Sequence, residues 1–444
     1  MTEKKWIQLS LILSLLFFPT LFLSSCNSSS SKKTYALWQF VAPRQMQWSG
    51  YGLALSPVIE KNYVIYAAGY HWQNQVYLFV VDQNTGKLVW KSEESVENFK
   101  VSGDRVLATT REFIHKKQPG QEREVKIICY KLDSGEIAWT QKSKVSGYEP
   151  RILSGGKNFY LWMPGLELYA LKKEDGELAW RMQRTGDKSP LAISTMYADG
   201  DTIYSATPKL AVSVFDGTSG KVEKLISLEK MPPTLITKME LFGDNLVLFG
   251  QSGILTIVDL KELKITYQDQ IGTTVEGVEV KDGKVYCGSA FKSDDGSVHS
   301  VLNCIDIKKK NLVWNKKFES EIKLAPLVEN GSVIIGTAGD DKFLYCLKRD
   351  NGKEKWRVEI GPVKDRPIVE GGVVYVAGKD AFYALDAESG EILLKQKPEQ
   401  FGPEAGPCLG EGKVIFVGQD SNLYAYKLLF DPGTKSTSGE KIKK

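Results

Sequence analysis

Cysteine and histidine are the residues of this sequence that could support redox, metal or acid–base chemistry. The cysteines are Cys26, Cys129, Cys287, Cys304, Cys346 and Cys408, and the histidines are His71, His115 and His299. No two cysteines are adjacent, and no C-x-x-C-H haem-attachment motif occurs. No histidine has a cysteine, aspartate or glutamate at the spacing of metal ligands. The sequence therefore predicts no catalytic residue, no cofactor-binding residue and no metal ligand, and a protein that is not an enzyme.

Two acidic segments could offer carboxylates to a cation. They are "KSDDGS" at residues 292–297 and "AGDDK" at residues 338–342. Aspartate and glycine are also the ordinary residues of turns. We therefore interpret both segments as loops between strands.

A repeated sequence pattern runs along the chain and predicts the elements that position these residues. "LYALKKEDGELAW" at residues 168–180 returns in similar form along the sequence, at intervals of 38 to 49 residues. Its last position, here called the tryptophan slot, holds Trp90, Trp139, Trp180, Trp314 and Trp356, with Lys224, Tyr267 and Leu394 in three degenerate copies. Four residues before the slot stands a glycine in six copies, and Leu263 or Lys310 in the other two. Glycine at this point supplies the positive φ that a tight hairpin needs.

Each phrase is preceded by another segment rich in β-branched and aromatic residues, such as "YVIYAAG" or "KVIFVG". Every unit therefore contains four short strands with turns between them and shows no helical periodicity. Strands at even spacing in units of about 40–45 residues are typical of the blades of a β-propeller. The fold class predicted for residues 34–430 is all-β, a single closed propeller of four-stranded blades.

The two ends of this region predict how the ring closes. The last unit has three strands and then runs into "FDPGTKSTSGEKIKK", while "TYALWQF" at residues 34–40 carries Trp38 with no repeat before it. We expect the N-terminal strand, residues 35–40, to pair with residues 423–427 and to complete the C-terminal blade. Such pairing removes an exposed sheet edge. Trp38 then joins the other slot tryptophans as a structural wedge between blades.

The phrase and its spacing resemble the PQQ-type propeller repeat. Propellers of that kind usually have eight blades, whereas the units here number nine, so either the ring has nine blades or a degenerate unit near Lys224 or Tyr267 is irregular. Quinoprotein dehydrogenases use this repeat to hold PQQ and calcium and carry two adjacent cysteines over the cofactor. That cysteine pair is missing here, and the resemblance implies the fold without the cofactor.

Five cysteines fall at positions of the repeat that are otherwise apolar. Cys129, Cys304 and Cys346 share the position ten residues before the tryptophan slot, where other copies have valine, alanine or isoleucine. Cys287 and Cys408 lie in predicted strands. Cysteine acting as a small buried hydrophobe explains all five. The alternative is a disulfide between adjacent blades.

The first residues of the chain predict export and lipidation. Lys4 and Lys5 precede the apolar stretch "LILSLLFFPTLFL", which suits a signal peptide over residues 1–25 better than a membrane-spanning anchor. "LSSC" ends this stretch and resembles the lipobox of bacterial lipoproteins, which implies lipid attachment at Cys26. Residues 26–33 then form a serine-rich tether, and residues 431–444 are expected to be a disordered basic tail.

The partner and the function are predicted by class. The net charge of +4 on 58 basic and 54 acidic residues gives no reason to expect nucleic acid. A lipid-anchored PQQ-repeat propeller without cofactor residues resembles the assembly-factor B lipoproteins of the outer-membrane β-barrel assembly machinery. That resemblance implies a monomeric scaffold for other envelope proteins, attached to the outer membrane and facing the periplasm. The alternatives are a quinoprotein-like periplasmic enzyme and a ligand-binding or adhesive surface propeller.

Overall fold

The computed structural model describes residues 36–42, 53–54, 56–70, 75–110, 122–146, 150–163, 167–183, 195–206, 211–228, 235–292, 298–338, 342–398 and 402–429. Residues 36–444 form one compact unit, and residues 1–35 form a second unit that lies outside the described residues. The predicted signal peptide, Cys26, the tether and the basic tail therefore also lie outside them. No helix in the described segments is long and apolar enough to cross a bilayer.

The strands within the described ranges assemble into nine sheets, here called blades 1 to 9. Blade 1 contains β2 (Leu53–Ala54), β3 (Val58–Glu60), β4 (Tyr63–Tyr70), β5 (Gln75–Asp82) and β6 (Leu88–Lys91). Blade 2 contains β7 (Val96–Ser102), β8 (Arg105–Thr110), β9 (Glu122–Lys131) and β10 (Ile137–Ser146). Blade 3 contains β11 (Arg151–Ser154), β12 (Asn158–Met163), β13 (Glu167–Lys172) and β14 (Leu178–Gln183).

The middle of the chain forms three further blades. Blade 4 contains β15 (Thr195–Asp199), β16 (Thr202–Ala206), β17 (Ala211–Asp216) and β18 (Val222–Ser227). Blade 5 contains β19 (Ile236–Phe242), β20 (Asn245–Gly250), β21 (Ile254–Asp259) and β22 (Lys264–Gln270). Blade 6 contains β23 (Thr274–Lys281), β24 (Lys284–Lys292), β25 (Val298–Asp306) and β26 (Asn311–Phe318).

The last three blades include the one that closes the ring. Blade 7 contains β27 (Leu327–Glu329), β28 (Ser332–Gly336), β29 (Phe343–Lys348) and β30 (Glu354–Glu359). Blade 8 contains β31 (Ile368–Glu370), β32 (Val373–Ala377), β33 (Phe382–Asp386) and β34 (Ile392–Gln396). Blade 9 contains β35 (Pro403–Gly410), β36 (Lys413–Gly418), β37 (Leu423–Lys427) and β1 (Ala36–Phe40).

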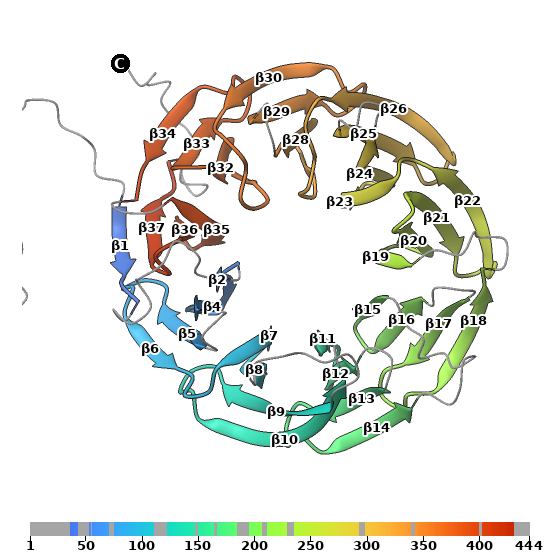
Figure 1. The fold of residues 1–444 in the computed structure, drawn as a ribbon, viewed down its shortest axis with the longest axis vertical. Coiled ribbons are helices and arrows are strands. Elements are labelled where there is room, and N and C mark those ends of the chain that lie inside the picture. The colour runs from blue at the N-terminus through green and yellow to red at the C-terminus, as the bar shows by residue number, and fades with distance from the viewer. Residues whose placement is uncertain are drawn as a thin grey trace, which may run out of the picture. The chain divides into compact units, whose positions relative to one another are not determined.

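The blades stand in a ring with the first strand of each nearest the centre and the fourth at the periphery (Figure 1). The fold is a nine-bladed β-propeller, so the predicted all-β class and the count of nine are confirmed. The units around Lys224 and Tyr267 form regular four-stranded sheets, β15–β18 and β19–β22. Blade 1 differs from the expectation of four strands because two short inner strands, β2 and β3, both pair with β4.

The predicted closure is confirmed. Strand β1 pairs antiparallel with β37, which places Trp38 opposite Ala425 and Phe40 opposite Leu423. Next to this pairing, the backbone N–H of Ala42 donates to the side-chain oxygen of Asn422 at 2.8 Å. The closing strand is thus fixed by the sheet ladder and by a buried side chain 380 residues away.

Alternation along each strand builds a hydrophobic core between every blade and its neighbours, because successive side chains in a strand point to opposite faces. In β4, Val64 and Tyr66 pack toward blade 9, whereas Ile65 and Ala67 pack toward blade 2. The residue ten before each slot lies directly opposite it on the neighbouring strand, as Cys129 does opposite Trp139. A small residue there leaves room for the indole, which accounts for the apolar and cysteine side chains at that position.

Candidate functional site

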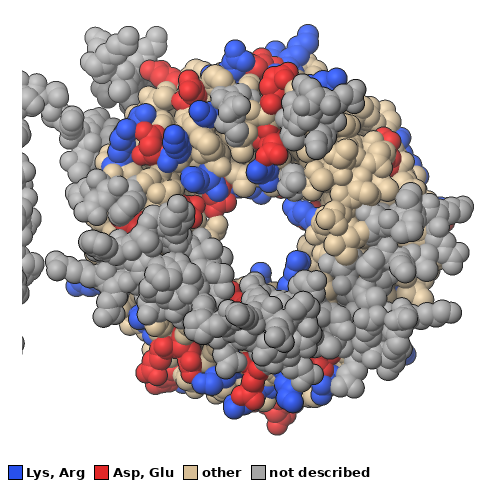
Figure 2. All heavy atoms as spheres, viewed as in Figure 1, with Lys and Arg blue, Asp and Glu red and all other residues tan. Residues whose placement is uncertain are grey.

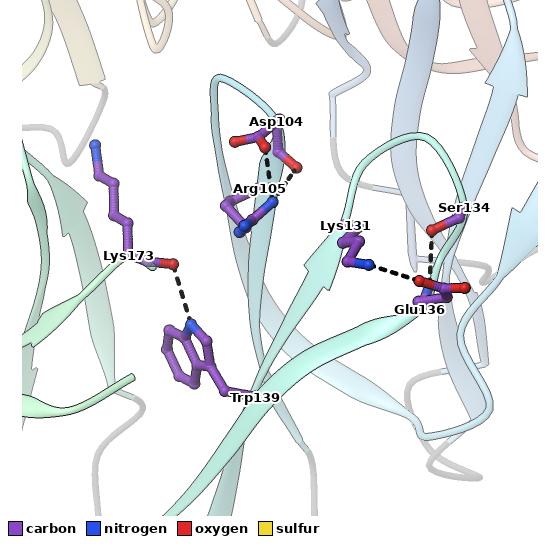
Figure 3. A network of polar contacts seen from close by, with 7 residues as sticks. All are labelled: Asp104, Arg105, Lys131, Ser134, Glu136, Trp139 and Lys173. Atoms are coloured by element: carbon purple, nitrogen blue, oxygen red, sulfur yellow. Dashed lines mark hydrogen bonds and ion pairs between the residues drawn. The ribbon is translucent and has the colours of Figure 1, made fainter. Parts of the chain in front are cut away.

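The contact between Trp139 and the next blade shows how the seams of the ring are built (Figure 3). Trp139 extends from β10, and its Nε1–H donates to the carbonyl oxygen of Lys173 at 3.1 Å. That carbonyl belongs to the turn between the third and fourth strands of blade 3. The corresponding turn of blade 2 is braced by an ion pair of 2.7 Å between Lys131 and Glu136. The indole N–H is thereby hydrogen-bonded to a backbone carbonyl of a turn. A buried indole N–H usually finds such a partner.

The same contact recurs around the ring. In each case the indole Nε1–H donates to the carbonyl one residue after the third strand of the following blade. The pairs are Trp38 with Gln83, Trp90 with Leu132, Trp139 with Lys173, Trp180 with Gly217, Trp314 with Arg349 and Trp356 with Ala387. Lys224, a degenerate slot residue, makes the equivalent bond through Nζ to the carbonyl of Leu260 at 3.2 Å. The slot residue therefore hydrogen-bonds to the following blade even where tryptophan is replaced by lysine.

Each slot tryptophan also lies against the following blade, at the glycine that stands four residues before the slot of that blade. An added Cβ at Gly220 would stand 2.6 Å from the Trp180 ring, and one at Gly86 would stand 2.7 Å from the Trp38 ring. The two non-glycine residues, Leu263 and Lys310, follow blades whose slots hold Lys224 and Tyr267 instead of tryptophan. Tryptophan and glycine are thus lost together, since a side chain fits at the turn only when the preceding indole is absent.

The backbone of these turns keeps its conformation where glycine is lost. Gly220 has a φ of 71°, and Leu263 and Lys310 have φ values of 52° and 58°. A left-handed conformation costs a non-glycine residue roughly 1–2 kcal/mol. The sequence pattern alone marks Leu263 and Lys310 as exceptions, whereas the structure places both in the same turn as the glycines. The role of the slot tryptophans as wedges between blades remains a prediction.

The innermost strands surround a central opening, and basic side chains lie around its rim on the face shown in Figure 2. The adjacent residues Asp365 and Arg366, just before β31, connect several blades there. Asp365 accepts hydrogen bonds from the Ser56 hydroxyl at 2.5 Å and the Gly406 N–H at 3.0 Å. Arg366 pairs with Glu279 at 3.0 Å and donates to the Pro326 carbonyl at 3.1 Å.

These contacts join blade 8 to blades 9 and 1 through Asp365, and to blades 7 and 6 through Arg366. The guanidinium of Arg366 is paired with a carboxylate and a carbonyl, and the Asp365 carboxylate accepts from a hydroxyl and a backbone N–H. Together these bonds connect five blades. No residue pattern in the sequence signals these bonds, because their partners lie one or two blades apart.

The cysteines in the described ranges are free thiols, so the interblade disulfide considered from the sequence is absent among them. Cys129, Cys287, Cys304 and Cys346 are buried, and Cys408 is half-buried. Burial raises the pKa of Cys129 from 9.0 to about 12 and that of Cys304 from 9.0 to about 11. Because the thiolate is the nucleophile and metal ligand, these thiols are poorly suited to either role at neutral pH.

The remaining residues that could do chemistry are scattered. His299 in β25 lies 3.1 Å from a carboxylate oxygen of Glu319, the residue after β26, a contact that the sequence spacing does not reveal. His71, His115 and the aspartates of both acidic segments lie outside the described residues. Within the described ranges, no three His, Cys, Asp or Glu side chains gather as metal ligands would. The described residues thus form a ring of blades in which the candidate chemical side chains are spread over separate strands.

Comparison with known protein families agrees with this geometry. A family described as "Outer membrane protein assembly factor BamB" matches residues 76–235, 272–359 and 340–431. The chain belongs to this family. The PQQ-like repeat inferred from the sequence is therefore the repeat of the BamB family.

Individual relatives are distant. The BamB of Yersinia pestis is 19% identical over 324 residues, a match that covers 66% of this chain and 78% of the relative. The bifunctional protein GlmU of Hyphomonas neptunium is 24% identical over 212 residues, which span 45% of this chain. The chain matches only 43% of the length of GlmU.

Solved structures share the fold. The structure of BamB from Moraxella catarrhalis superimposes with a TM-score of 0.50 at 13% identity, covering 89% of this chain and 97% of that chain. The quinohemoprotein alcohol dehydrogenase of Comamonas testosteroni superimposes with a TM-score of 0.52 at 12% identity, covering 90% of this chain and 77% of that chain. The likeness extends to a BamB and to an alcohol dehydrogenase alike, so the fold by itself does not define the activity.

Proposed function

We propose that this protein is a non-catalytic, lipid-anchored propeller scaffold that mediates contacts between envelope proteins, in the assembly of outer-membrane β-barrel proteins. Cys26 carries the lipid and holds the monomeric ring at the outer membrane, facing the periplasm. The observation that supports this most strongly is the match to the BamB family over most of the ring. The relatives named BamB are described as outer membrane protein assembly factors.

The chemistry of the ring also favours a scaffold. Cys129 and Cys304 have pKa values raised by burial, and the adjacent cysteine pair implied for quinoproteins is missing from the sequence. A closed ring of blades holds the ends of its strands in place, and loops carried on such a framework commonly serve as recognition surfaces. No bound small molecule is required for that role.

A quinoprotein-like enzyme is the second candidate. It is favoured by the structural likeness to quinohemoprotein alcohol dehydrogenases. Titration calorimetry of the protein with PQQ, with and without calcium, separates the two functions. A scaffold gives no heat of binding in either titration, whereas stoichiometric binding of PQQ would make the enzyme the better proposal.

The test of the scaffold itself is recovery of its partners. The lipidated protein, isolated from its own membranes, is expected to bring down proteins of the barrel assembly machinery. Isolation of the ring without any of those proteins would contradict the proposal.

A further inference from the structure

Both ends of the described chain meet the ring at one face. In a four-stranded meander, the turns between strands one and two and between strands three and four lie at the same face, here called the turn face. Strand β1 begins at that face, because Ala36 pairs with Tyr426 beside the end of β37. Strand β37 ends there too, since Lys427 pairs with Lys413 at the start of β36. The segment that carries Cys26 and the lysine-rich segment after Lys427 therefore both join the ring at the turn face.

Blade 6 presents three consecutive lysines at the turn face. Lys308, Lys309 and Lys310, here called the lysine patch, form the turn between β25 and β26, and all three are exposed. No ion pair within the described ranges includes any of them. The Asp306 carboxylate beside them accepts the backbone N–H of Lys309 at 2.7 Å. The patch thus concentrates positive charge on one blade.

Two further carboxylates at the turn face, on blades 6 and 5, have cationic partners. Asp282 pairs with Arg349 at 2.8 Å, and Asp244 pairs with Lys261 at 2.6 Å. These partners come from the turns of blades 7 and 5, on either side. The Asp306 carboxylate offsets one of the three lysine charges, and the rest of the charge of the patch is left for a ligand outside the ring.

Apolar side chains accompany the patch at the same face. Phe242, at the end of β19, is 38% exposed, and Leu263 in the turn before β22 is 43% exposed. Phe242 lies beside Gly283, whose carbonyl accepts the N–H of Ile307, the residue before the patch. Exposed aromatic and aliphatic groups next to lysines are typical of surfaces that rest in the headgroup region of a bilayer.

We propose that the turn face lies toward the membrane and that the lysine patch binds anionic phospholipid headgroups. The orientation rests on the lipid anchor at Cys26 given under the proposed function. Nine residues lie between Cys26 and Ala36, and the ten Cα–Cα steps that join them span at most about 35 Å when fully extended. A lipid at Cys26 therefore keeps the turn face close to the bilayer, which favours lipid over an acidic protein as the ligand. The opposite face remains accessible to protein partners.

Vesicle flotation of the protein beginning at Asn27 tests the patch without the lipid anchor. This chain retains every described residue, and with them all nine sheets and the closure. The vesicles contain phosphatidylcholine with or without phosphatidylglycerol, at low and at high salt. Binding is expected to require phosphatidylglycerol and to weaken with salt, since salt screens charges at an exposed surface.

A triple variant, Lys308→Gln with Lys309→Gln and Lys310→Gln, is expected to lower the vesicle affinity about 100-fold, since each lysine near an anionic surface contributes roughly a factor of five. The matched control replaces Lys364, Lys379 and Lys397 by glutamine. These three lysines belong to the opposite face around blade 8, and the control changes the net charge equally. The control is expected to keep the wild-type affinity.

Three results would overturn the proposal. They are no binding of wild type to phosphatidylglycerol vesicles, an equal loss of affinity in both triple variants, and patch-dependent binding to polyglutamate in place of vesicles. Failure of the lipid anchor is a separate result, because it appears as a protein without lipid at Cys26 in mass spectrometry. In that case the vesicle result stands, and only the orientation at the membrane is withdrawn.

Discussion

The indole of Trp180 and the backbone of Gly220 are in direct contact across the seam between blades 3 and 4. A Cβ on Gly220 would lie 2.6 Å from Cδ2 of the indole, whose Nε1–H donates to the nearby carbonyl of Gly217 at 2.8 Å. The tight fit explains why the two residue types recur together along the chain. It also makes the effect of each substitution predictable.

Trp180→Ala is expected to lower the free energy of unfolding by about 3–5 kcal/mol, since it removes a large packed ring. Gly220→Ala is expected to destabilise as well, because a Cβ would overlap the indole and the residue has a φ of 71°. Denaturant unfolding of both variants measures these changes. A Trp180→Ala protein as stable as wild type would show that the slot does not act as a wedge.

Leu263→Gly is a control that is expected not to lower the free energy of unfolding. Leu263 occupies the glycine position with a φ of 52°, and the preceding slot holds Lys224 instead of an indole. Relief of the left-handed strain is expected to offset the greater freedom of glycine in the unfolded chain, so the stability stays equal or rises by up to about 1 kcal/mol. A loss comparable to that of Gly220→Ala would refute the paired relationship.

The closure of the ring predicts that substitutions at two neighbouring residues of β1 differ in their effect on stability. Trp38 lies against Gly86 and donates to the Gln83 carbonyl at 2.9 Å, whereas Leu37 is 47% exposed. Trp38→Ala is expected to cost about 3 kcal/mol or more, and Leu37→Ala less than about 0.5 kcal/mol. Deletion of residues 34–40 is expected to destabilise the whole ring in one transition. Equal stability of the two point variants by denaturant unfolding would contradict the closure.

The fold could be predicted from the sequence because every blade of a propeller repeats the same pattern of strands and turns. Trp38, for example, identified the closing strand since it is a slot residue without its own repeat. The rim contacts could not be predicted, because Arg366 and Glu279 occupy unequal positions in their repeats and meet across blade 7. The conformation of Leu263 was also hidden, since leucine does not usually adopt a positive φ. Repeated contacts are visible in a sequence, and contacts made once are not.

The buried thiols predict that the stability of the fold falls at alkaline pH. Burial raises the pKa of Cys304 from 9.0 to about 11, so folding holds the proton on this thiol. Its contribution to stability is complete below pH 9 and is lost as the pH rises toward 11.

Burial of the thiols also predicts slow chemical labelling. Folded protein is expected to react with a thiol reagent much more slowly than protein in denaturant, when labelling is followed by mass spectrometry. Rapid labelling of Cys304 in the folded state would contradict its burial.

Cys26→Ser is expected to abolish lipid attachment. The variant should remain uncleaved or be released from membranes by a salt wash, which also removes electrostatic binding. Cys408→Ser is the control, since it keeps Cys26 and changes a thiol in the ring. Fractionation of envelopes with mass spectrometry of the N-terminal peptide measures both. A Cys26→Ser protein that stays with salt-washed membranes in cleaved form would refute the assignment.

Co-purification from native outer membranes tests the scaffold proposal most directly. The tagged, lipidated protein is isolated after mild crosslinking, and the proteins recovered with it are quantified against Cys26→Ser expressed at the same level. We expect enrichment of barrel assembly proteins with the lipidated protein and a strong reduction with the variant. Folded, lipidated protein that recovers none of them would contradict the scaffold proposal.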